Sequence, residues 1–171
     1  MQPARRSAAA LLAACCLTLV CTAFQDAEAS SSALRAGAYR CHSAGAILFG
    51  LMGLVYLGRR EFMPYHAIAV GKSWGELGSS EKAMFLASMR IIGAAWVALA
   101  LALGLLLRNG FRADETWAVS GVPAVGLLVS VPTLLAVLHV KRKTPASPPW
   151  PPLAVAVLLF LTGLALSFGA A

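Results

Sequence analysis

Four apolar runs follow one another along most of the chain and are separated by short polar segments. A transmembrane helix needs about 20 apolar residues to cross a hydrocarbon core about 30 Å thick, and each run is close to that length. The pattern therefore predicts an all-α protein, a transmembrane four-helix bundle. The expected spans are residues 43–58, 83–107, 117–139 and 153–170.

The first two spans are rich in small residues at helical spacing. Small residues let helix backbones approach closely in lipid, so we expect both spans to present helix-packing surfaces. These residues are Ala46, Gly50 and Gly53 in the first span, and Gly93, Ala94, Ala98 and Gly104 in the second. Ser79 or Ser80 is expected to cap the second helix, with Glu81 complementing its dipole.

The third span contains Pro123 and Pro132. A spanning helix tolerates proline where neighbouring helices or Ser and Thr side chains satisfy the carbonyl groups that proline leaves free. We expect Ser120, Ser130 and Thr133 to provide those hydrogen bonds.

The N-terminal segment has the features of a targeting sequence. Arg5 and Arg6 precede the apolar stretch from Ser7 to Phe24, which small residues follow. A basic start, an apolar centre and a small-residue exit are typical of a secretory signal peptide. Cleavage is expected after Ala23 or after Ala29, and we favour Ala29.

Three other interpretations of this segment stay open. It could be an uncleaved anchor helix, an organelle transit peptide, or a lipoprotein signal in which Leu12–Cys15 is the lipobox. The sequence thus predicts a targeting segment over residues 1–29, a linker over 30–42 and a membrane domain over 43–171.

The composition agrees with a membrane protein and excludes two other classes. Hydrophobic residues make up 59% of the chain and charged residues 12%. Soluble domains are nearer 45–50% apolar and 25% charged, and disordered chains need low hydrophobicity. The net charge of +7 comes with no nucleic-acid-binding motif, so we expect no nucleic-acid partner.

The positive charges instead indicate how the chain is threaded. Lys and Arg number four in residues 59–82 and three in 140–152, against two in 108–116 and none after the last span. Cytoplasmic loops carry the excess of Lys and Arg, so the first and third connections should be cytoplasmic and both chain ends outside. The membrane would be a bacterial inner membrane, or an organelle membrane if the N-terminal segment is a transit peptide.

Cysteine and histidine show no metal-site spacing. The cysteines are Cys15, Cys16, Cys21 and Cys41, and the histidines are His42, His66 and His139. Structural zinc sites need four closely organised ligands, so we expect neither a metal nor a cofactor. The chain also lacks the GxSxG, HExxH, P-loop and dinucleotide glycine patterns, which favours a non-enzymatic protein without excluding an enzyme.

The first connection is too apolar for a plain solvated loop. The spacing Ser73-x-x-Glu76 predicts a capping box and a short helix from Ser73, and residues 64–70 should form another. The second of these helices would lie in the membrane interface. The side chains expected in the lipid boundary are Phe62, Tyr65 and Ile68.

The same connection carries the candidate polar site. Glu61, Tyr65 and His66 could form the rim of a small-molecule or lipid-headgroup pocket and serve in proton transfer or hydrogen bonding. Arg90 joins them because ionisable residues in spans are rare and by default mark a site with a partner. Its partner would be Glu61, Glu76 or a serine of the third span. The alternative is that Arg90 snorkels to the cytoplasmic headgroups.

Several short motifs resemble a known family. Phe62–His66 (FMPYH), Ser73–Leu77 (SWGEL), Met89-Arg90 and Thr144–Trp150 (TPASPPW) are similar to motifs of small bacterial integral membrane proteins without an established function. The resemblance covers the chain from about Ala44 onwards. It implies four spans and supplies no catalytic role.

The sequence therefore favours a small accessory or subunit-type membrane protein. Its expected partners are membrane lipids and another membrane protein or a second copy of this chain. A lipid- or small-molecule-handling carrier or enzyme, with its site at the cytoplasmic membrane face, is the alternative.

Overall fold

The computed structural model describes residues 31–113 and 115–170 and shows an all-α bundle of four long antiparallel helices in that part of the chain. The long helices are α2 (Ser31–Gly58), α4 (Ser79–Leu106), α5 (Thr116–Lys143) and α6 (Trp150–Gly169). The short elements are α3 (Pro64–Val70), the 3-10 turn η1 (Trp74–Glu76) and the π-helical segment η2 (Leu107–Phe111), which continues α4.

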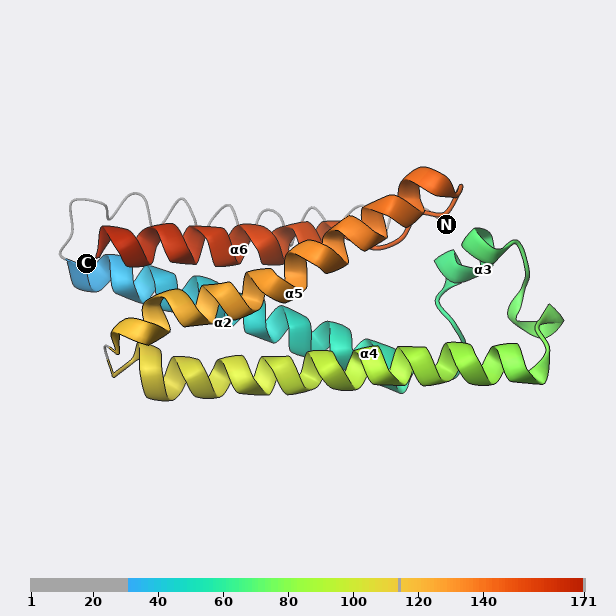
Figure 1. Ribbon diagram of the computed structural model, residues 1–171, viewed down its shortest axis with the longest axis horizontal. Helices are drawn as coiled ribbons and strands as arrows, with labels where there is room; N and C mark the ends of the chain where they lie inside the picture. The colour runs from blue at the N-terminus through green and yellow to red at the C-terminus, as the bar shows by residue number, and fades with distance from the viewer. Residues whose placement is uncertain (1–30, 114, 171) are drawn as a thin grey trace.

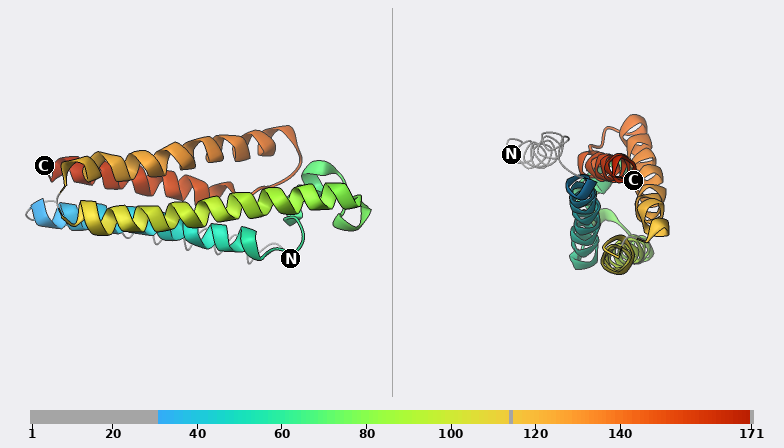
Figure 2. Two further views of the ribbon diagram at one scale, coloured as in Figure 1. Left: turned by 60° about the horizontal axis from the view of Figure 1, so that its bottom comes forward. Right: turned by 90° about the vertical axis from the view of Figure 1, so that its left-hand side faces the viewer.

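The connections alternate between the two ends of the bundle (Figures 1 and 2). The α2–α4 connection, which contains α3, lies at the same end as the α5–α6 connection, and we call this the α3 end. The start of α2, the end of α6 and the α4–α5 connection lie at the far end. The first and third connections therefore share one end.

All four long helices are long and apolar enough to cross a membrane. They are longer than predicted, most of all at the start of α2. The expected linker over 30–42 is wrong from Ser31 onwards, because those residues form the first three turns of α2. Arg35 and Arg40 lower the hydropathy of this stretch, so it does not look like part of an apolar span. It is nevertheless helical, because arginine, alanine and leucine all favour a helix.

The backbones of α2 and α4 touch where these two helices cross. A Cβ built on Gly53 would lie 2.8 Å from the carbonyl oxygen of Gly93, and a Cβ on Gly93 would lie 2.8 Å from that of Gly53. Both distances are shorter than a real Cβ contact allows, so the backbones touch because neither residue has a side chain. This crossing fixes the height of α2 against α4.

Aromatic rings seated against glycine hold α6 in the bundle. The ring of Phe160 on α6 lies where a Cβ of Gly45 on α2 and a Cβ of Gly126 on α5 would be. Phe160 is fully buried and stacks against Phe49, with ring centroids 6.0 Å apart. One side chain thus packs three helices together.

Small residues in the second span do not all pack against helices. Gly93 is buried, whereas Ala94, Ala98 and Gly104 are exposed. A Cβ on Gly104 would meet nothing within 4 Å in the described chain. Of the four, only Gly93 is buried in the face that meets α2. For Ala94, Ala98 and Gly104 the packing surface stays a prediction.

Two local hydrogen-bond predictions are also corrected. The N-cap of α4 is Gly78, whose N–H donates to Glu81 Oε2 at 2.8 Å, and not Ser79 or Ser80. In α5, the hydroxyls of Ser120 and Thr133 donate to the carbonyls of residues 117 and 129, which are not the carbonyls that Pro123 and Pro132 leave free. Ser130 Oγ is buried and has no partner among the described residues.

Substituting Gly93 with Ala should separate α2 from α4. The new methyl group would overlap the Gly53 carbonyl, so the backbones must move apart at a cost of about 1–3 kcal/mol in the free energy of unfolding. Unfolding of the purified protein by sodium dodecyl sulfate in mild detergent measures this cost.

Gly104→Ala is the matched control on the same helix. Its Cβ meets open space, and alanine favours a helix by about 1 kcal/mol over glycine, so this variant should be as stable as the parent or more stable. Equal destabilisation by the two substitutions would contradict the crossing at Gly93.

Candidate functional site

The α3 connection is an ordered structure built on local capping. Pro64 starts α3, and His66 Nδ1 accepts a hydrogen bond from the Met63 N–H at 3.3 Å. Gly71 ends the helix with φ of 74°, a left-handed conformation that glycine adopts without strain. The predicted helix over residues 64–70 is confirmed.

The predicted turn at Ser73 is confirmed as well. Glu76 Oε2 accepts a hydrogen bond from the Ser73 N–H at 2.6 Å, and a short 3-10 helix follows. The ion pair of Lys72 and Glu81, with 3.5 Å between Nζ and Oε1, links this turn to the first turn of α4.

Phe62 is the centre of an aromatic cluster that holds the connection on α4. Its ring packs edge-on against Trp74, Phe85 and His66, with centroid separations of 5.1, 5.5 and 6.0 Å. Phe62 is buried, so the prediction that it dips into lipid is wrong. Ile68 is exposed on α3, 52% of its surface being accessible.

Tyr65 and His66, two of the four candidate residues, are in contact beside this cluster. Tyr65 and His66 are neighbours whose rings are 4.2 Å apart, and the Tyr65 hydroxyl lies 2.7 Å from the Tyr56 hydroxyl at the end of α2. Burial, and then the adjacent Tyr56, raise the pKa of Tyr65 well above its ordinary value. Burial lowers the pKa of His66 below its ordinary 6.5.

Glu61 and Arg90 do not join this pair. Both are exposed, and neither makes a hydrogen bond or an ion pair with the residues that the structure describes. Arg90 therefore makes no hydrogen bond or ion pair with Glu61, Glu76 or a serine of α5 in the described structure. Of the four residues, the ring contacts bring together only Tyr65 and His66.

The height of Arg90 explains its exposure. Gly93 lies level with Leu57, since a Cβ on Gly93 would be 2.9 Å from the Leu57 nitrogen. Arg90 is three residues, or about 4.5 Å, further towards the α3 end, which is the height at which α2 ends at Gly58. This position favours the snorkelling interpretation over an ion pair inside the membrane.

His42 is a buried polar residue of the bundle core that sequence reasoning missed. It is fully buried between Phe111, at a centroid separation of 5.6 Å, and Phe160, at 5.9 Å. The ring lies against Gly163, in the space that a Cβ on this residue would occupy. Neither ring nitrogen has a hydrogen-bond partner in the described chain, which costs about 1–3 kcal/mol for each buried polar group left unpaired.

The sequence did hold a signal for His42. Ala38, His42, Gly45, Phe49 and Tyr56 recur at intervals of three, four or seven residues, the spacing of one helix face. All five are buried. Its distance in sequence from the other histidines argues only against a metal site, whereas its place on this helix face indicates a buried side chain.

The described residues contain no group of three His, Cys, Asp or Glu side chains that could hold a metal ion. Tyr65 and His66 can donate and accept hydrogen bonds, so the packed connection also carries a polar pair of side chains.

No family model, curated protein or solved structure matches the chain in the three comparisons made. The resemblance carried by FMPYH, SWGEL and TPASPPW stays a prediction.

The fold of the α3 connection should weaken as the pH falls below about 6.5. The pKa of His66 is lowered in the folded state, so the unfolded connection binds the proton more readily. Stability is then complete above pH 6.5 and decreases below it, by at most about 1.4 kcal/mol per pH unit for one group. Amide hydrogen exchange over residues 62–77 at pH 7.5 and 5.5, corrected for the intrinsic rates, measures it.

His66→Gln should remove most of this pH dependence, because glutamine keeps a side-chain acceptor at the capping position and does not titrate. His139→Gln, an exposed histidine on α5, is the control and should leave the dependence unchanged. An identical pH response in all three proteins would show that His66 is not its source.

Proposed function

We propose that the protein is a small accessory subunit of a membrane complex, without catalytic activity of its own, that binds a partner transmembrane helix along the outer face of α4. The observation that carries this proposal is an alanine stripe, defined as Ala94, Ala98 and Ala102, all exposed. The three residues follow one another at intervals of four and so share one helix face.

The two faces of α4 differ in a way that favours a second helix contact. Its inner face is buried on α2 and includes Met89, Gly93, Trp96 and Leu103. α4 makes few contacts with α5, so its outer side is uncovered in the chain described. Small residues at lipid depth allow a helix backbone to approach closely, as Gly93 does on the inner face.

The exposed side chains of α5 provide the comparison. Leu128 and Leu135 are 75% and 61% exposed, and large aliphatic side chains are the usual neighbours of lipid tails. The α4 stripe is flanked by Ile91 and Leu105, 69% and 60% exposed, which would border a docked helix. The outer face of α4 thus has a row of small alanine side chains with a large apolar side chain beyond each end of the row.

The second candidate function is lipid or small-molecule handling at the α3 end. It is favoured by the hydrogen bond of Tyr56 and Tyr65 beside His66, a polar group of side chains at the boundary of the apolar helices. Glu61 and Arg90 would then contact a ligand from the solvent side.

For the location, we propose that the α3 end faces the cytoplasm of a bacterial cell, or the equivalent side of an organelle membrane. The support is the distribution of Lys and Arg among the described residues. The α3 end carries Arg59, Arg60, Lys72, Lys82, Lys141, Arg142 and Lys143, and the far end carries Arg35, Arg40, Arg108 and Arg112. A cleaved signal peptide would agree with this orientation.

Cysteine labelling should find residues 108 and 141 on opposite sides of the membrane. Arg108→Cys and Lys141→Cys, each in a background without native cysteines, are treated in intact cells with a membrane-impermeant maleimide. We expect labelling of Cys at 108 only, because the far end is outside. Labelling of both positions would contradict the threading.

A photo-cross-linking amino acid at position 98 should trap the partner helix. In the native membrane we expect a discrete protein adduct, which mass spectrometry identifies, because the side chain at 98 would lie inside the helix contact. The same amino acid at position 128 on α5 is the control and should give lipid adducts only.

An adduct with a second copy of this chain would identify the partner as the protein itself. Lipid adducts alone at position 98, matching those at position 128, would overturn the proposed function.

A further inference from the structure

Helix α4 carries the same seven-residue repeat on two opposite faces. The inner seam is a row of buried or half-buried residues at alternating intervals of four and three, namely Met89, Gly93, Trp96, Ala100 and Leu103. The outer seam is an exposed row with the same intervals, namely Ala87, Ile91, Ala94, Ala98, Leu101 and Leu105. Each residue of the inner seam follows one of the outer seam by two positions, which turns an α-helix by about 200°. The two seams therefore lie on opposite sides of α4.

The inner seam shows what this repeat does in the structure. Besides the crossing of the two glycines, Trp96 packs against Phe49 of α2, with ring centroids 6.2 Å apart. A Cβ on Gly50 of α2 would lie 3.4 Å from the Cβ of Ala100. Apolar residues at alternating intervals of three and four keep one face of a helix against a partner helix. The inner seam is accordingly the surface that packs on α2, and the outer seam repeats its spacing.

No charged residue interrupts the outer seam. The charged residues of α4 are Glu81, Lys82 and Arg90. Glu81 pairs with Lys72, and Lys82 lies over the ring of Trp74 at 5.9 Å, so both are directed to the α3 connection. Arg90 lies beside the seam, at a position that is not part of it. α4 forms one edge of the bundle (Figure 1), so the whole apolar row is open to a neighbour in the plane of the membrane.

The outer seam continues past the level at which α2 ends. Met84 precedes Ala87 by three residues, as the repeat requires, and 66% of its surface is accessible. It lies six residues, or about 9 Å, beyond Arg90, which is level with the end of α2. Arg59 and Arg60 follow that end, and arginines at the end of an apolar helix reach the headgroups. Lipid tails therefore do not cover Met84, whereas a second helix along the seam would.

The order of small and large residues along the outer seam fits a second copy of the same helix. Chains with the same threading place their α4 helices parallel, so a twofold axis along the membrane normal lets each position of the seam meet itself. Helices packed through this repeat cross at about 20° and separate on either side of the crossing point. Ala94 and Ala98 allow close approach at the crossing, and the longer side chains of Ile91 and Leu101 fill the wider space beyond it.

We propose that two copies of this chain associate through the outer seam, with their α4 helices parallel and crossing at Ala94 and Ala98. This inference rests on the proposed function, since it names a second copy of the chain as the partner helix. Close packing of the small residues provides the attraction between the helices in lipid.

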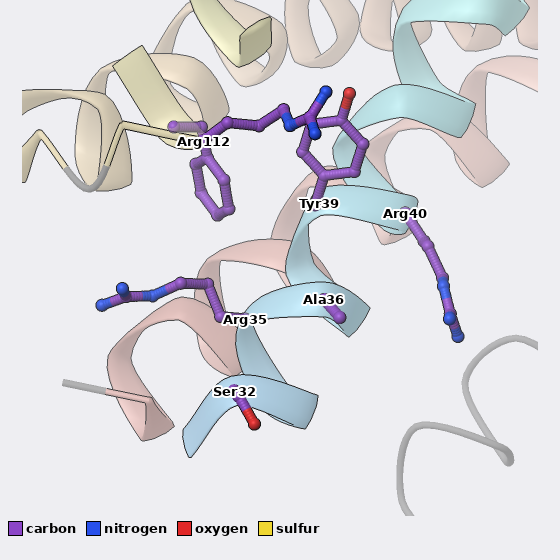
Figure 3. Close-up of a pocket in the computed structure, with 7 residues that line it drawn as sticks. Ser32, Arg35, Ala36, Tyr39, Arg40 and Arg112 are labelled. Carbon is purple, nitrogen blue, oxygen red and sulfur yellow. The ribbon is translucent and has the colours of Figure 1, made fainter. Parts of the chain in front are cut away.

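The proposed contact does not involve the open pocket at the far end of the bundle (Figure 3). That pocket is lined by the first turns of α2 and by Phe111 and Arg112, none of which belongs to the outer seam. The side chains of Arg35 and Arg112 extend in opposite directions there. The dimer contact therefore uses a different part of the surface.

Disulfide formation between copies in the native membrane tests the seam. Single cysteines replace Ile91, Ala94, Ala98 or Leu101, each in a background without native cysteines, and the membranes are oxidised with copper phenanthroline. Non-reducing electrophoresis should show covalent dimers for all four variants, because each of these positions meets itself across the twofold axis and a disulfide needs that proximity.

Ile92→Cys and Leu128→Cys are the controls for random collision. Both positions are apolar and exposed, at 41% and 75%, and lie outside the seam, so both variants should stay monomeric under the same treatment. Equal dimer formation by the controls and the seam variants would overturn the proposal, and so would the absence of dimers from every seam variant.

Ala98→Leu tests the same contact without oxidation. The larger side chain holds the helices apart at the crossing, so the apparent dissociation constant of the dimer should rise about tenfold or more. Förster transfer between labelled copies in phosphatidylcholine vesicles measures it, and Leu128→Ala on α5 should associate as the parent does. Unchanged association of Ala98→Leu would contradict the crossing.

The photo-cross-linking amino acid at position 98 separates this inference from the proposed function. An adduct with a different protein, together with no disulfide dimers, would overturn the second copy as the partner and leave the proposed function standing. Lipid adducts alone, together with no disulfide dimers, would overturn both.

Discussion

The contact of two glycine backbones at Gly53 and Gly93 determines the relative height of α2 and α4, and much of the structure follows from it. With that height fixed, the first three turns of α4 extend past the end of α2 at the α3 end (Figure 1). Those turns provide Phe85, on which Phe62 packs and holds α3. The same offset places Arg90 at the end of α2, where its charge can reach the headgroups.

Helices α5 and α6 are held in the bundle by aromatic rings that occupy the space left by the missing side chains of glycines. The ring of Phe160 lies against Gly45 and Gly126, and the ring of His42 lies against Gly163. Dispersion between closely packed atoms replaces the hydrophobic effect as the main attraction between helices inside a bilayer. A buried histidine without a partner among the described residues is costly in such a core. Its ring still contributes packing against Phe111 and Phe160.

The sequence predicted the elements well and their contacts poorly. Apolar length was enough to find the four spans, and the short helix from Pro64 and the turn at Ser73 followed from local capping. The start of α2 was missed because hydropathy decreases at Arg35 and Arg40 although the helix continues. The spacing of small residues could not show that Gly93 contacts another helix and Gly104 does not. The position of α2 decides which face of α4 is covered, and the sequence of α4 does not contain that information. For the candidate site, Tyr65 and His66 are neighbours in sequence and their rings are in contact. The position of Arg90 depends on the offset between α2 and α4, which the local sequence does not encode.

Disulfide formation between α2 and α4 tests the helix crossing most directly. A Cβ on Gly50 would lie 3.4 Å from the Cβ of Ala100, close to the 3.5–4.5 Å that a disulfide spans. In a background without native cysteines, Gly50→Cys with Ala100→Cys should oxidise readily in the membrane, and Gly50→Cys with Gly104→Cys should not. Efficient oxidation of the second pair, or none of the first, would contradict the register on which the account depends.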